Sequence, residues 1–193
     1  NWNRENKKPF LPVDENPEAW NAGNIQSVAG CPIIVGDSLY FYMSGRYNSR
    51  PVHPSNFATG LATLRRDGFA SFHSDKKECY LKTIPIEVTG PYLFVNAEIK
   101  GSLYAELLDA NSNVIKGFSK HDFEIVKKKN STKLQLRWKN EDISSLIGKK
   151  ISIRFYTKNT DIYSFWFSKT EKGFSGGYTA GGGPLLSPTG IDQ

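Results

Sequence analysis

The chain has 193 residues, of which 38% are hydrophobic and 13% aromatic, enough for one good core or for one domain and a fragment of another. Its formal charge of +6 comes from 25 basic and 19 acidic residues spread along the sequence, so nucleic acid is not an expected partner, whereas an acidic or sulfated polysaccharide is compatible. No segment approaches the roughly 20 apolar residues of a membrane span, and no spacing of cysteines or histidines indicates a metal. Neither a metal nor a cofactor is expected.

The front part of the chain has the pattern of a few short strands. Residues 1–30 are predicted to be irregular, because their prolines are incompatible with a helix interior or a central strand. Residues 32–35 and 39–43 are predicted to pair as a hairpin around the turn Gly36-Asp37. Residues 61–64 are apolar and rich in strand formers, so they are predicted to form a buried third strand.

The densest charge of the front part, Arg65-Arg66-Asp67, follows this third strand directly and precedes Gly68. A strand that ends in this way is either a tight turn held by an arginine–carboxylate pair or the rim of a site. We favour a structural hinge in which Arg65 or Arg66 holds Asp67.

From residue 78 the sequence changes to short apolar stretches separated by turn signals, among them Lys100-Gly101, Lys129-Asn130 and Asn159-Thr160. Only residues 142–147 suggest a helical turn. Eight short strands at nearly regular spacing favour a two-sheet sandwich. The predicted strands are residues 79–88, 91–99, 102–109, 113–117, 121–127, 132–138, 150–157 and 161–168.

The end of the chain, residues 173–193, is rich in glycine and is predicted to be a flexible or wrapping extension. The two cysteines, Cys31 and Cys79, lie in different segments. They can pair only if the fold brings them within bridging distance, which leaves their state open.

Catalytic chemistry has few candidate residues in this sequence. The three histidines belong to no recognisable nucleophile motif, so a serine-hydrolase triad is not expected. Glycosidase chemistry needs two carboxyl groups, for which the front part offers Asp37, Asp67 and Asp75. The arginines beside Asp67 favour its ionised form, which suits an anchor better than a proton donor. No catalytic residue is assigned.

Residues 59–71, TGLATLRRDGFAS, resemble a segment of bacterial glycosidase-like proteins related to the invertase and levanase families. Those proteins join a five-bladed β-propeller to a C-terminal β-sandwich. Residues 36–46 resemble the last propeller blade, and residues 93–97 and 161–165 resemble the sandwich. The resemblance therefore covers most of the chain.

The resemblance implies an all-β chain in which a partial propeller blade is followed by a jelly-roll-like β-sandwich. Residues 1–75 would be the blade-like segment and hinge, residues 76–172 the sandwich, and residues 173–193 the extension. The related enzymes carry their catalytic acids on the first blades, which have no matching positions here. The chain, which begins without Met, is thus expected to be a piece of a larger protein, with the rest of the propeller on sequence outside it.

The resemblance also implies a function. We expect the accessory part of a secreted, cell-surface or periplasmic bacterial protein, a glycoside hydrolase acting on a polysaccharide or oligosaccharide. A carbohydrate-binding role would need aromatic side chains for stacking and polar groups for the hydroxyls. Trp166, Trp138 and Tyr104 are the candidate aromatic residues, and Arg46 is the candidate polar residue.

The position of Trp166 follows from strand alternation. If residues 161–167 alternate regularly, Tyr163, Phe165 and Phe167 share the core face and Trp166 lies on the outer face, either covered by the glycine-rich tail or open to a sugar ring. The alternative for Trp138 is that it fills the core. If all these aromatic residues are packed, the alternative function is a structural or adhesive β-sandwich without a sugar site.

Overall fold

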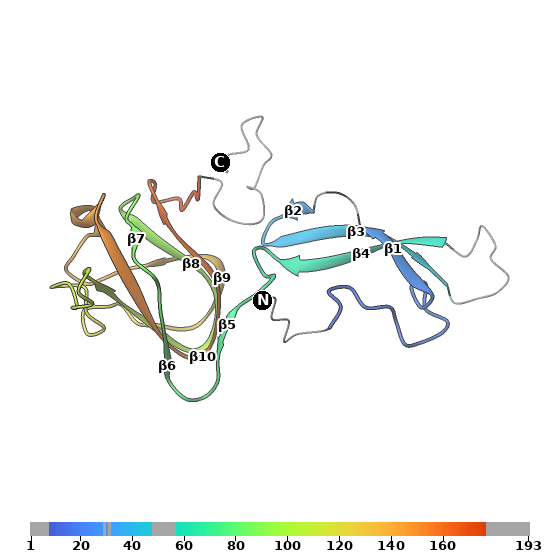
Figure 1. Ribbon diagram of the computed structural model, residues 1–193, viewed down its shortest axis with the longest axis horizontal. Helices are drawn as coiled ribbons and strands as arrows, with labels where there is room; N and C mark the ends of the chain where they lie inside the picture. Colours follow the sequence, from blue (N-terminus) through green and yellow to red (C-terminus); the bar gives the residue numbers. More distant parts are fainter. Residues whose placement is uncertain (1–7, 29, 31, 48–56, 177–193) are drawn as a thin grey trace. The chain divides into compact units, whose positions relative to one another are not determined.

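The computed structural model describes residues 8–28, 30, 32–47 and 57–176, and its regular structure is almost entirely antiparallel β (Figure 1). The described residues contain one 3₁₀ turn and no α-helix, so the prediction of an all-β chain is confirmed. No helix in this part of the chain is long and apolar enough to cross a membrane. The chain divides into two compact units, residues 1–64 (the first unit) and residues 65–193 (the second unit).

The first unit contains a four-stranded sheet in which β3 is the central strand. The predicted hairpin is confirmed: β2 pairs antiparallel with β3, and Val35 lies opposite Ser38 across a two-residue turn in which Gly36 has a φ of 57°. The strands of this sheet are β1 (Asn24–Val28), β2 (Ile33–Val35), β3 (Ser38–Arg46) and β4 (Phe57–Arg65).

The prediction that residues 1–30 are irregular is wrong for residues 24–28, which form β1. This strand has the polar sequence NIQSV, and it is defined by its pairing with β3, in which Asn24 lies opposite Arg46. Its register shifts between Ile25 and Ser27. Pairing with a distant strand, and not local propensity, makes this segment extended.

One face of this sheet is covered by the segment that precedes it. Leu39 and Met43 of β3 are buried, and Trp20 packs against the backbone of β3 and β4. An added Cβ would lie 2.4 Å from the Trp20 ring at Gly45 and 2.1 Å from it at Gly60. Glycine at these two positions lets the indole lie directly on the sheet.

The other face of the sheet is exposed and carries several large apolar side chains among polar ones. The small residues of β4 point inward, so Leu61 points outward and is 46% exposed. The prediction of a strand over residues 61–64 is confirmed, but the prediction that it is buried is wrong, because Leu61 and Thr63 are exposed and Ala62 and Leu64 are only partly buried. The exposed large apolar side chains of these strands include Ile33, Val35, Tyr42, Phe57 and Leu61.

The second unit is built on one six-stranded antiparallel sheet that curls into a half-barrel (Figure 1). The main strand order is β5-β10-β8-β9, and β6 and β7 also pair with β10. A 3₁₀ turn over Ile143–Leu146 confirms the predicted helical turn; the Asp142 side chain caps it by accepting a hydrogen bond from the Ser144 amide. The strands are β5 (Phe72–Ser74), β6 (Cys79–Lys82), β7 (Ile86–Glu87), β8 (Tyr92–Leu108), β9 (Val126–Leu136) and β10 (Lys150–Ser168).

The prediction of eight short strands is wrong. The predicted strands 91–99 and 102–109 are one continuous strand, β8, and the predicted strands 150–157 and 161–168 are both parts of β10. Residues 113–117 contribute only an isolated bridge between Val114 and Leu108.

The chain does not reverse at any of the three predicted turns; each lies at or next to a bulge, and the bulges lie side by side. Ile99 and Ser102 of β8 pair with Lys129 and Lys127 of β9 on one side, and with Thr160 and Lys158 of β10 on the other. Two residues of β8, Lys100 and Gly101, therefore lie opposite a single residue of each neighbouring strand. The middle residues, Lys128 and Asn159, both have a φ of 47°. This bulge row bends all three long strands at the same level.

A second bulge corrects the predicted faces of residues 161–167. The register with β8 shifts between Ile162 and Ser164, so the alternation changes at Tyr163. As predicted, Phe165 and Phe167 pack against the core. Ile162, predicted to lie on the outer face, is buried in the core, and Tyr163 lies under the guanidinium of Arg65 instead.

Candidate functional site

The outer face of the large sheet carries a row of tyrosines beyond the bulge row. Tyr156 of β10 lies directly opposite Tyr80 of β6 and Tyr104 of β8, so the three side chains lie on one face of adjacent strands. We call these residues the tyrosine row. The Tyr80 and Tyr156 ring centroids are 6.2 Å apart, and Tyr80 is 63% exposed.

The next cross-strand row on this face is charged, because Arg154 lies opposite Lys82 on one side and Glu106 on the other. We call these three residues the charged row. Arg154 Nη1 donates to Glu106 Oε1 over 2.6 Å, and the Tyr156 hydroxyl donates to the same oxygen over 2.8 Å. Glu106 is therefore almost completely buried but has two partners, as a buried carboxylate requires.

Lys120 covers one end of the tyrosine row. Its ammonium lies 4.8 Å from the ring centroid of Tyr104 and 4.3 Å from that of Tyr156, and it donates to Glu78 over 2.7 Å. Tyr80, at the other end, has a large exposed surface. An exposed tyrosine ring beside charged hydrogen-bonding groups can stack on the apolar face of a sugar and bind its hydroxyl groups.

Of the predicted aromatic residues, Tyr104 belongs to this site. Tyr80 and Tyr156 were missed, although both lie in alternating segments, Cys-Tyr-Leu-Lys and Ile-Arg-Phe-Tyr, in which the apolar partners mark the core face. The alternation could have placed both tyrosines on an outer face. It could not have shown that they lie opposite each other, since that depends on strand register.

Trp166 lies on the outer face, as predicted. It is covered by the start of the glycine-rich segment and is not open to a sugar ring. It is 8% exposed and stacks on Phe94, with ring centroids 5.8 Å apart and planes 15° apart. Its Nε1 donates to the Gly173 carbonyl over 3.1 Å. The first residues of the glycine-rich segment therefore close this half of the outer face.

Trp138 belongs to the core, which was the alternative to a sugar-binding role. It is 5% exposed, and its ring makes edge contacts with Phe118 and Phe123 at centroid distances of 5.5 and 5.2 Å. Its indole nitrogen is buried and has no hydrogen-bond partner.

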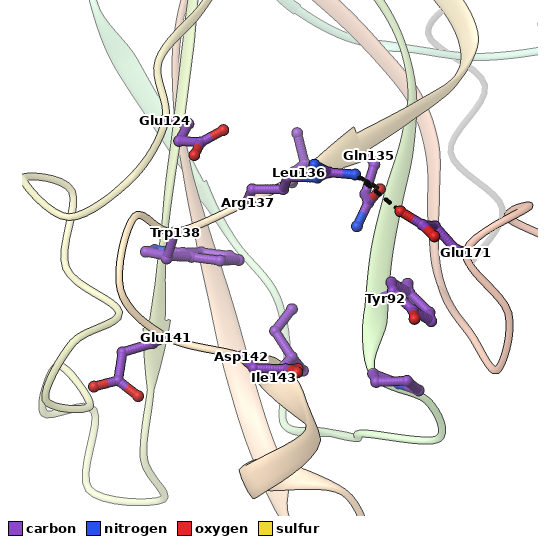
Figure 2. A pocket seen from close by; sticks show the side chains of 11 residues that line it. Tyr92, Glu124, Gln135, Leu136, Arg137, Trp138, Glu141, Asp142, Ile143 and Glu171 are labelled. Atoms are coloured by element: carbon purple, nitrogen blue, oxygen red, sulfur yellow. Dashed lines mark hydrogen bonds and ion pairs between the residues drawn. The ribbon is translucent and has the colours of Figure 1, made fainter.

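Trp138 also lines a shallow polar pocket of about 220 Å³ (Figure 2). On one side, Arg137 Nη2 reaches Gln135 Oε1 over 2.6 Å and Glu171 Oε1 over 3.4 Å. The Asp142 carboxylate in this pocket is already used as the cap of the 3₁₀ turn. The remaining lining residues are Pro91, Tyr92, Glu124, Leu136, Glu141 and Ile143.

Arg46, the predicted polar residue, lies in the first unit at the end of β3. Its guanidinium carbon is 4.5 Å from the centroid of the Phe57 ring. This contact joins β3 to β4 and stabilises the exposed face of that sheet. Arg46 therefore has a structural contact that does not depend on a ligand.

The predicted hinge is an anchored turn. Arg65 donates from Nε to Asn96 Oδ1 over 2.7 Å, from Nη1 to Asn130 Oδ1 over 2.5 Å and from Nη2 to the Ala97 carbonyl over 3.3 Å. The Asn96 amide in turn donates to the Arg66 carbonyl over 2.6 Å. The arginine that holds this turn is therefore Arg65, through its contacts with β8 and β9.

Asp67 is the buried residue with positive φ in this turn, at 55°, a conformation that aspartate tolerates better than most residues. Gly68, the next residue, is required for a steric reason. An added Cβ there would lie 2.7 Å from the Arg65 carbonyl oxygen, so glycine permits a close approach of the backbone.

A small polar cluster joins β5 to β10. The Ser71 hydroxyl and His73 Nδ1 both contact Asp161 Oδ1 over 2.9 Å, and His73 Nε2 lies 3.3 Å from Asp75 Oδ1. The hydrogen bond with Asp161 raises the pKa of His73 above its ordinary value. The serine donates to the aspartate and not to the histidine, so this order of contacts is not that of a hydrolase triad.

Cys79 is a free thiol 3.5 Å from the Thr157 hydroxyl, and Cys31 lies outside the described residues. Among the residues that the structure describes, no group of three or more histidine, cysteine or acidic side chains could hold a metal ion. Comparisons of the chain with protein-family models, curated proteins and solved structures find no match.

Proposed function

We propose that the second unit binds a polysaccharide or oligosaccharide at the tyrosine row, as a non-catalytic part of a carbohydrate-active protein. The observation that carries this proposal is Tyr80, which is 63% exposed at the end of three aligned tyrosines. Tyrosine is an efficient residue for such contacts, since its ring is apolar and rigid and its hydroxyl can donate or accept. The adjacent charged row supplies further hydrogen-bonding groups.

The larger protein would be a secreted or surface-bound glycoside hydrolase, as the resemblance of residues 59–71 implies. The exposed large apolar side chains of the first sheet support a further part of this proposal, that propeller blades outside this chain pack on them. A partner that covers these large apolar side chains would remove them from water, which is favourable. The catalytic acids would lie on those blades, so the chain alone is expected to release no reducing sugar from any polysaccharide.

Affinity electrophoresis in gels that contain a polysaccharide tests the binding role. The parent chain should be retarded by at least one polysaccharide, and Tyr80→Ala should lose most of that retardation. Tyr42→Ala is the matched control, because Tyr42 is also an exposed tyrosine on a sheet, at 44%, but belongs to the first unit. Equal retardation of the parent and Tyr80→Ala would overturn the assignment of the site.

The second candidate function is a structural or adhesive β-sandwich without a sugar site. The packing of both Trp138 and Trp166 favours it, because the two largest candidate platforms are not open. A chain that no polysaccharide retards, and whose Tyr80→Ala variant is unchanged in every respect, would have this function.

A further inference from the structure

We infer that the glycan bound at the tyrosine row is anionic and that Lys82 binds its negatively charged group. This inference rests on the proposed function, since it concerns the chemistry of the ligand at the same site. It goes further in naming a class of glycan, one with a carboxylate on the sugar ring, and the residue that selects it.

Lys82 is placed beside the open ring by the alternation of β6. In this strand Leu81 packs against the core, whereas Tyr80 and Lys82 are exposed. Alternate residues of a strand are about 7 Å apart on the same face. The flexible lysine side chain can cover that distance, so its ammonium can reach a substituent at the edge of a sugar stacked on Tyr80.

Two of the cations at the site are neutralised by carboxylates. Arg154 is paired with Glu106 over 2.6 Å, and Lys120 is paired with Glu78 over 2.7 Å. Lys82 donates over 2.6 Å to the hydroxyl of Ser112, which carries no charge. Among the described residues, no carboxylate lies within ion-pair distance of the Lys82 ammonium.

Asp109 is the acidic residue nearest in the sequence to Ser112, the partner of Lys82, and lies in the same turn. Its carboxylate accepts hydrogen bonds from the Asn111 and Asn113 amides over 2.9 and 2.8 Å, and these bonds lower its pKa. Asp109 is therefore committed to the turn. Lys82 therefore remains a cation with a neutral partner, two residues along β6 from the most exposed aromatic ring of the site.

This arrangement favours an acidic over a neutral sugar. A neutral glycan would gain only the stacking contact and hydroxyl hydrogen bonds, whereas a uronate would add an ion pair with Lys82. Exposed ion pairs contribute up to about 1 kcal/mol, which corresponds to about fivefold in affinity. The preference should therefore be measurable but modest, and it should weaken as salt screens the pair.

Two matched pairs of polysaccharides test the inference in affinity gels: polygalacturonate against its methyl-esterified form, and dextran sulfate against dextran. The parent chain should bind polygalacturonate about fivefold more tightly than the ester. Lys82→Gln should lose this preference and Lys82→Arg should keep it. Lys149→Gln, which removes an exposed lysine outside both rows, is the control and should behave as the parent.

The outcomes separate this inference from the function on which it rests. Equal affinity for the free and esterified polymers, or an unchanged preference in Lys82→Gln, would overturn the role of Lys82 while leaving glycan binding in place. A preference for dextran sulfate alone would overturn the assignment to a carboxylate. Binding to another polysaccharide but to none of these four polymers would overturn the inference alone, whereas retardation by no polysaccharide would overturn the proposed function as well.

Discussion

Trp166 and Tyr80 are both large aromatic residues on the outer face of the same sheet, yet they differ in what surrounds them. Trp166 lies against Phe94 and the Gly173 carbonyl, whereas Tyr80 is largely exposed. We expect Trp166→Ala to lower the free energy of unfolding by about 3 kcal/mol, because truncating a buried tryptophan removes its contacts and leaves a cavity. Urea denaturation followed by circular dichroism measures the loss.

Tyr80→Ala is the control for this experiment, because an exposed side chain away from special features changes stability by about 0.5 kcal/mol or less. If Trp166→Ala unfolds at the same urea concentration as the parent, the segment at Gly173 does not hold the indole in solution.

Arg65 and Asn96 stabilise the turn that follows β4 through one shared hydrogen bond and several further contacts. Each of Arg65→Ala and Asn96→Ala should destabilise the chain, and together they should cost less than the sum of the single effects. A double-mutant cycle is expected to give a coupling energy of about 1 kcal/mol, since the bond joins a charged donor to a buried amide.

Arg66 provides the comparison, because the contact found for it uses its carbonyl oxygen and not its guanidinium. Arg66→Ala should therefore melt close to the parent. A larger loss of stability for Arg66→Ala than for Arg65→Ala would show that Arg66, and not Arg65, holds the turn.

At the scale of the strands, the sequence predicted which residues are extended better than where the strands end. Gly101 and Asn159 are of residue types that are common in turns, but both lie in bulges. The same conformational freedom suits a hairpin turn and a bulge, because each needs a residue that tolerates positive φ or a close approach of two backbones. Only the register of the neighbouring strands distinguishes the two cases.

The candidate site was only partly predictable for the same reason. Tyr104 was predicted as a candidate, but the row exists because β6 and β8 both pair with β10 at Tyr156. Trp166 was a candidate because it is large and was predicted to lie on the outer face, and that position is correct. Its cover could not be chosen from sequence, because the segment at Gly173 meets it through a tertiary contact.

The bulge row itself can be tested at Gly101. An added Cβ at this position would lie 2.2 Å from the Lys158 carbonyl oxygen, so Gly101→Val should destabilise the second unit by about 1–3 kcal/mol. Asn159→Gly, at the opposite bulge residue, should change stability by less than about 1 kcal/mol, because glycine adopts the same positive φ. Thermal melts measure both effects. A higher melting temperature for Gly101→Val than for Asn159→Gly would contradict the bulge assignment.

The contact between β5 and β10 should depend on pH through His73. The hydrogen bond with Asp161 raises the pKa of His73 above 6.5, so the charged form is favoured in the folded state. Its stabilising effect is fully present below pH 6.5 and is lost as the pH rises through the raised pKa. The His73 resonances should titrate at higher pH in the parent than in Asp161→Asn, as measured by NMR.

His73→Gln should remove the corresponding pH dependence of the melting temperature. An unshifted His73 titration in the parent chain would show that the cluster with Asp161 and Asp75 does not form in solution.

At the scale of the molecule, the first unit presents a sheet face with several large apolar side chains exposed to water. We expect the chain to self-associate as its concentration rises, and Leu61→Lys to reduce this association, since a charge in the middle of the face opposes its burial. Light scattering after gel filtration measures both. Ile84→Lys is the matched control, because Ile84 is 79% exposed but belongs to the second unit. Equal masses for the parent and Leu61→Lys at every concentration would contradict the prediction.

The central position of β10 has a consequence for how the second unit is made in the cell. This strand is the last one in the described part of the chain, yet β5, β6, β7 and β8 all pair with it. During synthesis the earlier strands leave the ribosome before their common partner exists, and contacts between distant strands form slowly in any case. Until residues 150–168 have emerged, the nascent chain exposes unpaired strand edges, and exposed edges of this kind favour aggregation.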